Sequence, residues 1–64
     1  MASTAIQEID YDETYEVLTV TFTDGSTYKY WNVPQEVYAE LLYAGSAGSY
    51  FNREIRGKYN YRGG

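Results

Sequence analysis

Alternating apolar and polar positions in the first half of the chain predict three β-strands. A short first strand is expected over residues 5–11 (AIQEIDY). The segment 17–22 (VLTVTF) is rich in β-branched residues and alternates in the manner of a half-buried strand. Asp24-Gly25 is a turn signal that joins this segment to a third strand over residues 26–31.

The pattern changes to a helical period after the third strand. Pro34 suits the first turn of a helix, and Gly45 suits its C-terminal cap. The apolar face of this helix would consist of Val37, Tyr38, Leu41 and Leu42. A second helix is predicted over residues 47–56, with Ser46 as its N-cap and Gly57 as its stop. Its apolar face would consist of Ala47, Tyr50, Phe51 and Ile55.

Together these elements predict a single α+β domain. We expect a three-stranded antiparallel β-meander followed by two short helices packed on one face. The core would span about residues 6–59, and residues 60–64 would form a frayed tail.

The register of the hairpin decides which tyrosines are buried. A two-residue turn on Asp24-Gly25 places Lys29 beside Val20, whereas a three-residue loop over 23–25 places Tyr28 there instead. We favour the three-residue loop, because burying Lys29 without a partner costs more than a loop preference can offset. Tyr28 and Tyr30 would then belong mostly to the core. The open face would carry Thr19, Thr21, Lys29 and Trp31.

Composition narrows the possible functions. The 64 residues include no cysteine and no histidine, which excludes disulfides, thiolate metal sites and Cys-His or Ser-His-Asp catalysis. We therefore expect neither an enzyme, nor a metal site, nor a cofactor. Aromatic residues make up 19% of the chain, and such a small domain needs either a dense aromatic core or association into a homo-oligomer.

The N-terminus has neither a basic segment nor an apolar run, and no stretch approaches 18 apolar residues. We therefore expect a cytoplasmic protein without membrane contact.

Charge is unevenly distributed along the chain. Residues 1–50 carry a balance of −7 and residues 51–64 a balance of +3. The basic part includes arginines, which match phosphate oxygens in a bidentate manner, and tyrosines, on which bases can stack. The predicted ligand-binding residues are Ser46, Ser49, Asn52, Arg53, Arg56, Lys58, Tyr59 and Arg62. Alternatively, Arg53 and Arg56 are merely solvated or paired with Glu54 or Glu40.

Several short motifs together resemble the KTSC domain family. They are Tyr-x-Tyr at 28–30, Val-Pro at 33–34, Val-Tyr at 37–38, Ala-Gly-Ser-Ala-Gly at 44–48, Tyr-Phe-Asn at 50–52 and Ile-Arg at 55–56. The resemblance runs from about Ile6 to Tyr59. This family is named for the C-terminus of some lysyl-tRNA synthetases and also includes stand-alone bacterial and phage proteins. The resemblance implies RNA binding. Since no synthetase catalytic domain is present in this sequence, we expect no aminoacylation.

Two hypotheses of function follow. In the first, the protein is a non-catalytic module that binds RNA or a nucleotide-type phosphate ligand, one version being a phage-type protein that sequesters nucleotides. In the second, it is a protein interaction or assembly module without a nucleotide ligand, and Trp31 and Tyr43 lie at the interface.

Overall fold

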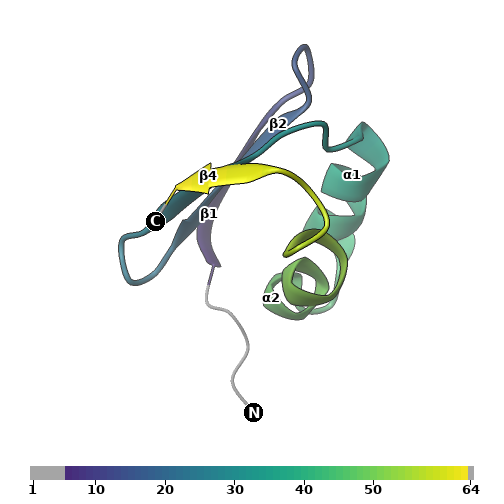
Figure 1. The fold of residues 1–64 in the computed structure, drawn as a ribbon. Helices are drawn as coiled ribbons and strands as arrows, with labels where there is room; N and C mark the ends of the chain where they lie inside the picture. The colour runs from purple at the N-terminus through teal and green to yellow at the C-terminus, as the bar shows by residue number, and fades with distance from the viewer. Residues whose placement is uncertain (1–5, 64) are drawn as a thin grey trace.

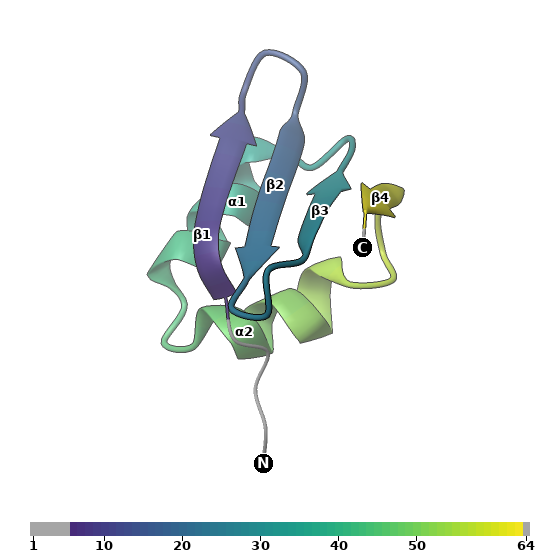
Figure 2. The same cartoon turned by 90° about the vertical axis from the view of Figure 1, so that its left-hand side faces the viewer.

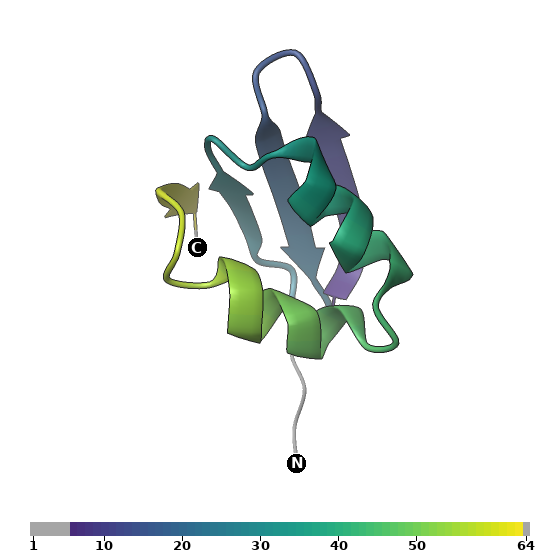
Figure 3. The same cartoon turned by 90° about the vertical axis from the view of Figure 1, so that its right-hand side faces the viewer.

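The computed structural model describes residues 6–63, which form one antiparallel sheet with helices on one side (Figure 1). The strands are β1 (Ile6–Asp12), β2 (Val17–Phe22), β3 (Thr27–Tyr30) and β4 (Tyr61–Gly63). The helices are α1 (Gln35–Tyr43), α2 (Ala47–Tyr50) and the π-helical turn η1 (Phe51–Ile55), which continues α2 directly. Both helical segments lie on the same face of the sheet (Figure 3).

The sheet has the order β1-β2-β3-β4, so each strand pairs with its neighbour in sequence. The predicted α+β class is confirmed, but the predicted three-stranded sheet is incomplete. Residues 61–63, expected to belong to a frayed tail, return to the sheet as β4 and pair with β3. Three residues with one glycine carry little strand propensity of their own. The free edge of β3 supplies the pairing that makes this segment a strand.

The β2–β3 hairpin has the three-residue loop that the burial argument favoured. Val20 lies opposite Tyr28, and Leu18 lies opposite Tyr30. The Gly25 amide donates to the Phe22 carbonyl at 2.9 Å, and Gly25 has φ +94°, a backbone conformation that favours glycine. Tyr30 is buried as predicted, with 3% of its surface exposed, whereas Tyr28 is only partly buried.

The core lies between the sheet and the helices. Its fully enclosed side chains are Leu18, Val20, Val33, Leu41, Phe51 and Ile55. Tyr11 closes one side of this core, since its ring stacks on that of Tyr38 at 4.5 Å and its hydroxyl donates to the Val33 carbonyl at 2.7 Å. Aromatic side chains thus cover the sides of the apolar core in this small domain.

Helix α1 departs from the prediction at both ends and on its face. Pro34 is the N-cap rather than a first-turn residue, and Ala44 is the C-cap in an extended conformation, so Gly45 follows the helix without a left-handed turn. Leu41 is buried, but Leu42 is 51% exposed and its assignment to the apolar face was wrong. Successive residues lie about 100° apart around the helix axis, so Leu42 points away from the side of α1 that buries Leu41.

The second helical segment begins as predicted, but it changes from an α-helix to a π-helical turn after Tyr50. The Ser46 hydroxyl accepts from the Ser49 amide at 3.3 Å, which confirms Ser46 as the N-cap. After Tyr50 the helix widens, and the Arg56 amide donates to the Phe51 carbonyl five residues earlier at 2.8 Å. Gly57, with φ +80°, then ends the segment as expected. Among the described residues, no helix is long and apolar enough to cross a membrane.

Candidate ligand-binding pocket

A pocket of about 520 Å³ opens between the β2–β3 hairpin loop, the end of η1 and strand β4. Its lining includes three tyrosines and one arginine: Tyr28, Tyr30, Tyr61 and Arg56. We call this the tyrosine–arginine pocket. Its volume lies in the range of small-molecule sites, which typically measure about 300–1,000 Å³.

The tyrosine rings form one continuous wall of the pocket. The rings of Tyr30 and Tyr61 are stacked, with centroids 5.5 Å apart and planes 28° apart. Tyr28 lies 5.8 Å from Tyr61 and 6.5 Å from Tyr30. Tyr61 is 57% exposed and Tyr30 is buried, so the wall leads from solvent into the core. A planar ligand would find an aromatic surface here that is already ordered by packing.

Arg56 brings a positive charge to this wall. The guanidinium donates from Nη1 to Asn52 Oδ1 at 3.2 Å, which is its one hydrogen bond among residues 6–63. A guanidinium has five N–H donors, so most of them remain available to a ligand. Burial raises the pKa of the Tyr30 hydroxyl, and the neighbouring Arg56 charge acts in the opposite direction. Arg56 lines the same pocket as Tyr28, Tyr30 and Tyr61, so its charge lies beside the aromatic wall.

The hairpin loop supplies a negative group to the same pocket. Asp24 Oδ1 accepts from the Ser26 amide at 2.9 Å and from the Ser26 hydroxyl at 2.7 Å. The hydrogen bond from the Ser26 amide is the main reason that the pKa of Asp24 is lowered. The carboxylate is therefore ionised at neutral pH and can only accept hydrogen bonds. Asp24 and Arg56 line one pocket without forming an ion pair, so the pocket offers both an acceptor and a set of donors.

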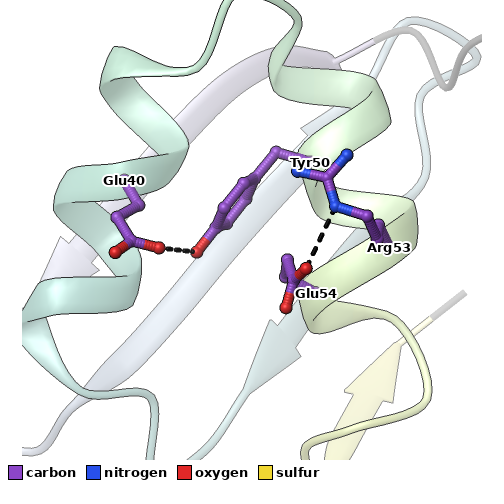
Figure 4. Close-up of polar contacts among 4 residues, drawn as sticks. All are labelled: Glu40, Tyr50, Arg53 and Glu54. Atoms are coloured by element: carbon purple, nitrogen blue, oxygen red, sulfur yellow. Dashed lines mark hydrogen bonds and ion pairs between the residues drawn. The ribbon is translucent and has the colours of Figure 1, made fainter.

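Arg53, predicted to act together with Arg56, makes its contacts elsewhere. Its Nε forms an ion pair with Glu54 Oε2 at 3.0 Å, and its guanidinium lies 5.6 Å from the centre of the Tyr50 ring (Figure 4). The Tyr50 hydroxyl in turn donates to Glu40 Oε1 on α1 at 2.6 Å. Arg53 thus belongs to a surface cluster between α1 and η1, and does not line the tyrosine–arginine pocket.

The remaining predicted residues are spread over three places. Ser46 and Ser49 bond each other at the start of α2. Lys58 and Tyr59 line a second, shallower hollow together with Trp31, whose amide donates to the Asn60 carbonyl at 2.9 Å. Arg62 lies opposite Lys29 in the sheet, on the face away from the helices. Only Arg56 of the predicted set lines the tyrosine–arginine pocket.

The two predicted interface residues lie apart as well. Trp31 is partly buried after the end of β3, and Tyr43 is 87% exposed at the end of α1. Their role in an interface stays a prediction.

Sequence reasoning missed part of the pocket. Tyr28 and Tyr30 were assigned mostly to the core, Asp24 was interpreted only as a turn residue, and Ser26 only as the first residue of the third strand. The alternation of Tyr59 and Tyr61 was the available signal for an additional strand, and that strand would have carried Tyr61 next to Tyr30.

The comparisons with known proteins agree with this fold. The family model described as the KTSC domain matches residues 2–59. The chain belongs to the KTSC domain family. A crystal structure of a KTSC domain protein from Yersinia pestis superposes on this KTSC chain with a TM-score of 0.86 at 33% identity, covering 97% of this chain and 87% of that one.

Two kinds of relatives are similar to this KTSC domain. A lysine–tRNA ligase of Trichormus variabilis is 45% identical over 56 residues, which are 88% of this chain and only 10% of the ligase. A protein of Tsukamurella paurometabola is 39% identical over 57 residues, covering 89% of this chain and 85% of that protein. The KTSC chain thus spans a tenth of the synthetase and most of the shorter relative.

Proposed function

We propose that this KTSC domain is a non-catalytic module that binds a nucleotide or a short single-stranded RNA at the tyrosine–arginine pocket. The observation that carries the proposal is the junction of an aromatic wall with a largely unpaired guanidinium in one pocket of suitable size. The base would stack on Tyr61 at the exposed end of the wall, and a phosphate would accept from Arg56. The module would hold the ligand without altering it.

The presence of Asp24 in the pocket favours a nucleotide ligand over a free inorganic anion. Its ionised carboxylate repels a free phosphate or sulfate, but it accepts hydrogen bonds from an exocyclic amine or a ribose hydroxyl. Some of the relatives are lysine–tRNA ligases, enzymes whose name includes an RNA substrate, which supports the RNA form of the proposal.

The expected affinity is low. Stacking on one aromatic ring contributes about 1–3 kcal/mol, and a hydrogen bond to a charged group contributes about 1.5–3 kcal/mol. Since a dissociation constant of about 1 mM corresponds to about 4 kcal/mol, a mononucleotide should bind in the millimolar range. The chain has nine acidic and five basic residues, so long-range attraction adds little.

The test is an NMR titration with adenosine monophosphate, uridine monophosphate and oligouridylate, each to about 10 mM, well above the expected dissociation constant. Nucleosides and inorganic phosphate serve as separate probes of the two halves of the ligand. We expect the amides of Tyr28, Tyr30, Arg56 and Tyr61 to shift with the nucleotides and less with either half.

Matched arginine variants decide whether the pocket is responsible. Arg56→Gln should weaken binding about tenfold, as expected for one lost charged hydrogen bond. Arg56→Lys should also weaken it, because lysine lacks the bidentate fork. Arg53→Gln is the control and should bind normally. No shift with any probe, or an equal loss in the Arg53→Gln variant, would refute the proposal.

A further inference from the structure

Figure 2 looks onto the face of the sheet that the helices leave open. The residues of this face give it an acidic side and a basic side. On β1, Glu8 lies opposite Thr21, Asp10 opposite Thr19 and Asp12 opposite Val17. Residues directly opposite in an antiparallel pair project from the same face, so the three acids share the open face with the β2 residues that alternate with the core positions Leu18 and Val20.

The other side of the open face is basic. Lys29 Nζ donates to Thr19 Oγ1 at 3.4 Å, which places the lysine on this face. Arg62 lies directly opposite Lys29, while its neighbour Tyr61 stacks on Tyr30 on the covered face. Two cations in one cross-strand pair repel each other. Within residues 6–63 neither of them forms an ion pair, and neither do the three acids of β1.

Threonines separate the two charged sides. The hydroxyls of Thr21 and Thr27 lie 3.5 Å apart, and Thr19 accepts from Lys29. Since neighbouring strands are about 4.8 Å apart, β1 and β3 lie about 10 Å apart, too far for their charges to pair within one chain. Within residues 6–63 these acids and bases form no ion pair with one another and stay exposed to water, so both charged sides are available to a partner of opposite charge.

We propose that this open face binds the open face of a second copy of the chain. A twofold axis parallel to the strands, passing between β2 and β3, lays β1 of each copy over β4 of the other and β2 over β3. Asp10, Thr19, Lys29 and Arg62 lie at one level across the sheet, so Asp10 of each copy faces Arg62 of the other, with Lys29 one strand away. Glu8 and Asp12 lie on either side of Asp10 along β1. A twofold axis perpendicular to the strands would instead place β1 on β1, which like charges oppose.

Pairing through the free edge of β1 is disfavoured for the same reason. Two antiparallel β1 edges would bring Glu8, Asp10 and Asp12 of one copy beside those of the other. Charged residues on an edge strand commonly prevent such pairing. The charge pattern thus favours the face over the edge.

The size of the open face sets the strength of the contact. Four short strands cover roughly 400 Å², about half of the 800 Å² that each partner buries in a standard interface. We therefore expect a weak dimer that depends on charge and dissociates in salt.

The experiment is sedimentation equilibrium up to about 1 mM protein, a concentration that suits a weak contact. At low salt the mass should rise from 7.4 kDa toward twice that value, and at high salt it should fall back. The double variant Lys29→Glu with Arg62→Glu should remain monomeric, and so should Glu8→Lys with Asp10→Lys. An equimolar mixture of these two variants should restore the dimer, because their faces are again complementary.

A control variant carries the same change in net charge away from the open face: Arg53→Glu with Lys58→Glu, which should dimerise like the wild type. A wild-type mass of 7.4 kDa at every concentration would overturn the proposal. A mixture that stays monomeric would overturn it too. Stronger self-association of the Glu8→Lys, Asp10→Lys variant would show that β1 edges pair instead.

Discussion

The two faces of the sheet are built from alternate residues of the same strands, yet they differ in nearly every property. On the covered face Leu18, Val20 and Tyr30 pack against the helices and lose almost all contact with water. On the open face Thr19 and Lys29 stay accessible to solvent. One six-residue segment, VLTVTF, thus contributes to both surfaces. A register shift of one residue would exchange the two faces of the sheet. The hairpin loop therefore determines which side chains form the core and which stay exposed.

The largest expected effect tests this division directly. Tyr30→Ala should destabilise the fold by about 3 kcal/mol or more, because it removes a buried aromatic ring between Phe51 and Tyr61. Lys29→Ala, one residue earlier, should change the free energy of unfolding by less than about 0.5 kcal/mol. Urea denaturation of both variants measures the difference. Equal losses would mean that the two faces are wrongly assigned.

A second pair of variants compares a buried with an exposed position on helix α1. Leu41 is fully buried and Leu42 is 51% exposed. Leu41→Ala should cost about 2–5 kcal/mol, as other buried leucines do, whereas Leu42→Ala should cost less than about 1 kcal/mol. Thermal denaturation gives the ranking. A reversed order would indicate that α1 presents a different side to the sheet.

Strand β4 allows a test of how the pocket depends on the edge of the sheet. An added Cβ on Gly63 would collide with the Thr27 carbonyl and lie 2.8 Å from the Tyr28 Cα, and the residue has φ +146°. Gly63→Ala should therefore release β4 and cost about 1 kcal/mol, roughly the value of the lost Tyr30–Tyr61 stacking.

Hydrogen exchange should show this release as faster exchange of the amides of residues 61–63, with the rest of the sheet still protected. Gly45→Ala is the matched control, because its added Cβ would meet nothing within 4 Å. Unchanged protection of β4 in the Gly63→Ala variant would contradict the expectation.

The smallest effect concerns pH. The hydrogen bond to Glu40 is the main cause that raises the pKa of Tyr50 from 10.0 to about 12. A group with a raised pKa stabilises the folded state fully below its unfolded pKa. This stabilisation is lost as pH rises from about 10 to about 12. Tyr50→Phe should therefore be less stable than the wild type at pH 8 and should lose less stability at pH 11, as measured by urea denaturation. If the wild type and the Tyr50→Phe variant lost the same free energy of unfolding at alkaline pH, the effect would come from other tyrosines.

The two halves of the chain differed in how well the sequence predicted them. The β2–β3 register followed from one local argument, the cost of burying Lys29, and the structure confirms it. The Ser46 cap likewise depends on neighbouring residues only. Strand β4 and the π-helical turn were missed, because each depends on a partner distant in sequence: β4 on the edge of β3, and η1 on packing that buries both Phe51 and Ile55.

The candidate site was predicted only in part for the same reason. Arg56 was selected from its charge and position, but its pairing with Arg53 assumed a regular helix with 100° between residues. The π-helical turn breaks that assumption, and the two arginines make different contacts. The tyrosine wall combines residues from β3 and β4, and no local pattern shows that these meet.

The π-helical turn η1 also has a consequence for chain length. Its characteristic hydrogen bond spans five residues, one more than an α-helical bond, so the turn holds one residue in excess of a regular helix. Asn52 lies on its exposed side. Deleting this residue would let the Arg56 amide reach the Phe51 carbonyl through an ordinary α-helical bond. The same deletion would remove the hydrogen bond from the Arg56 guanidinium to Asn52. The extra residue of the π-helical turn is thus also the residue that holds the arginine at the pocket.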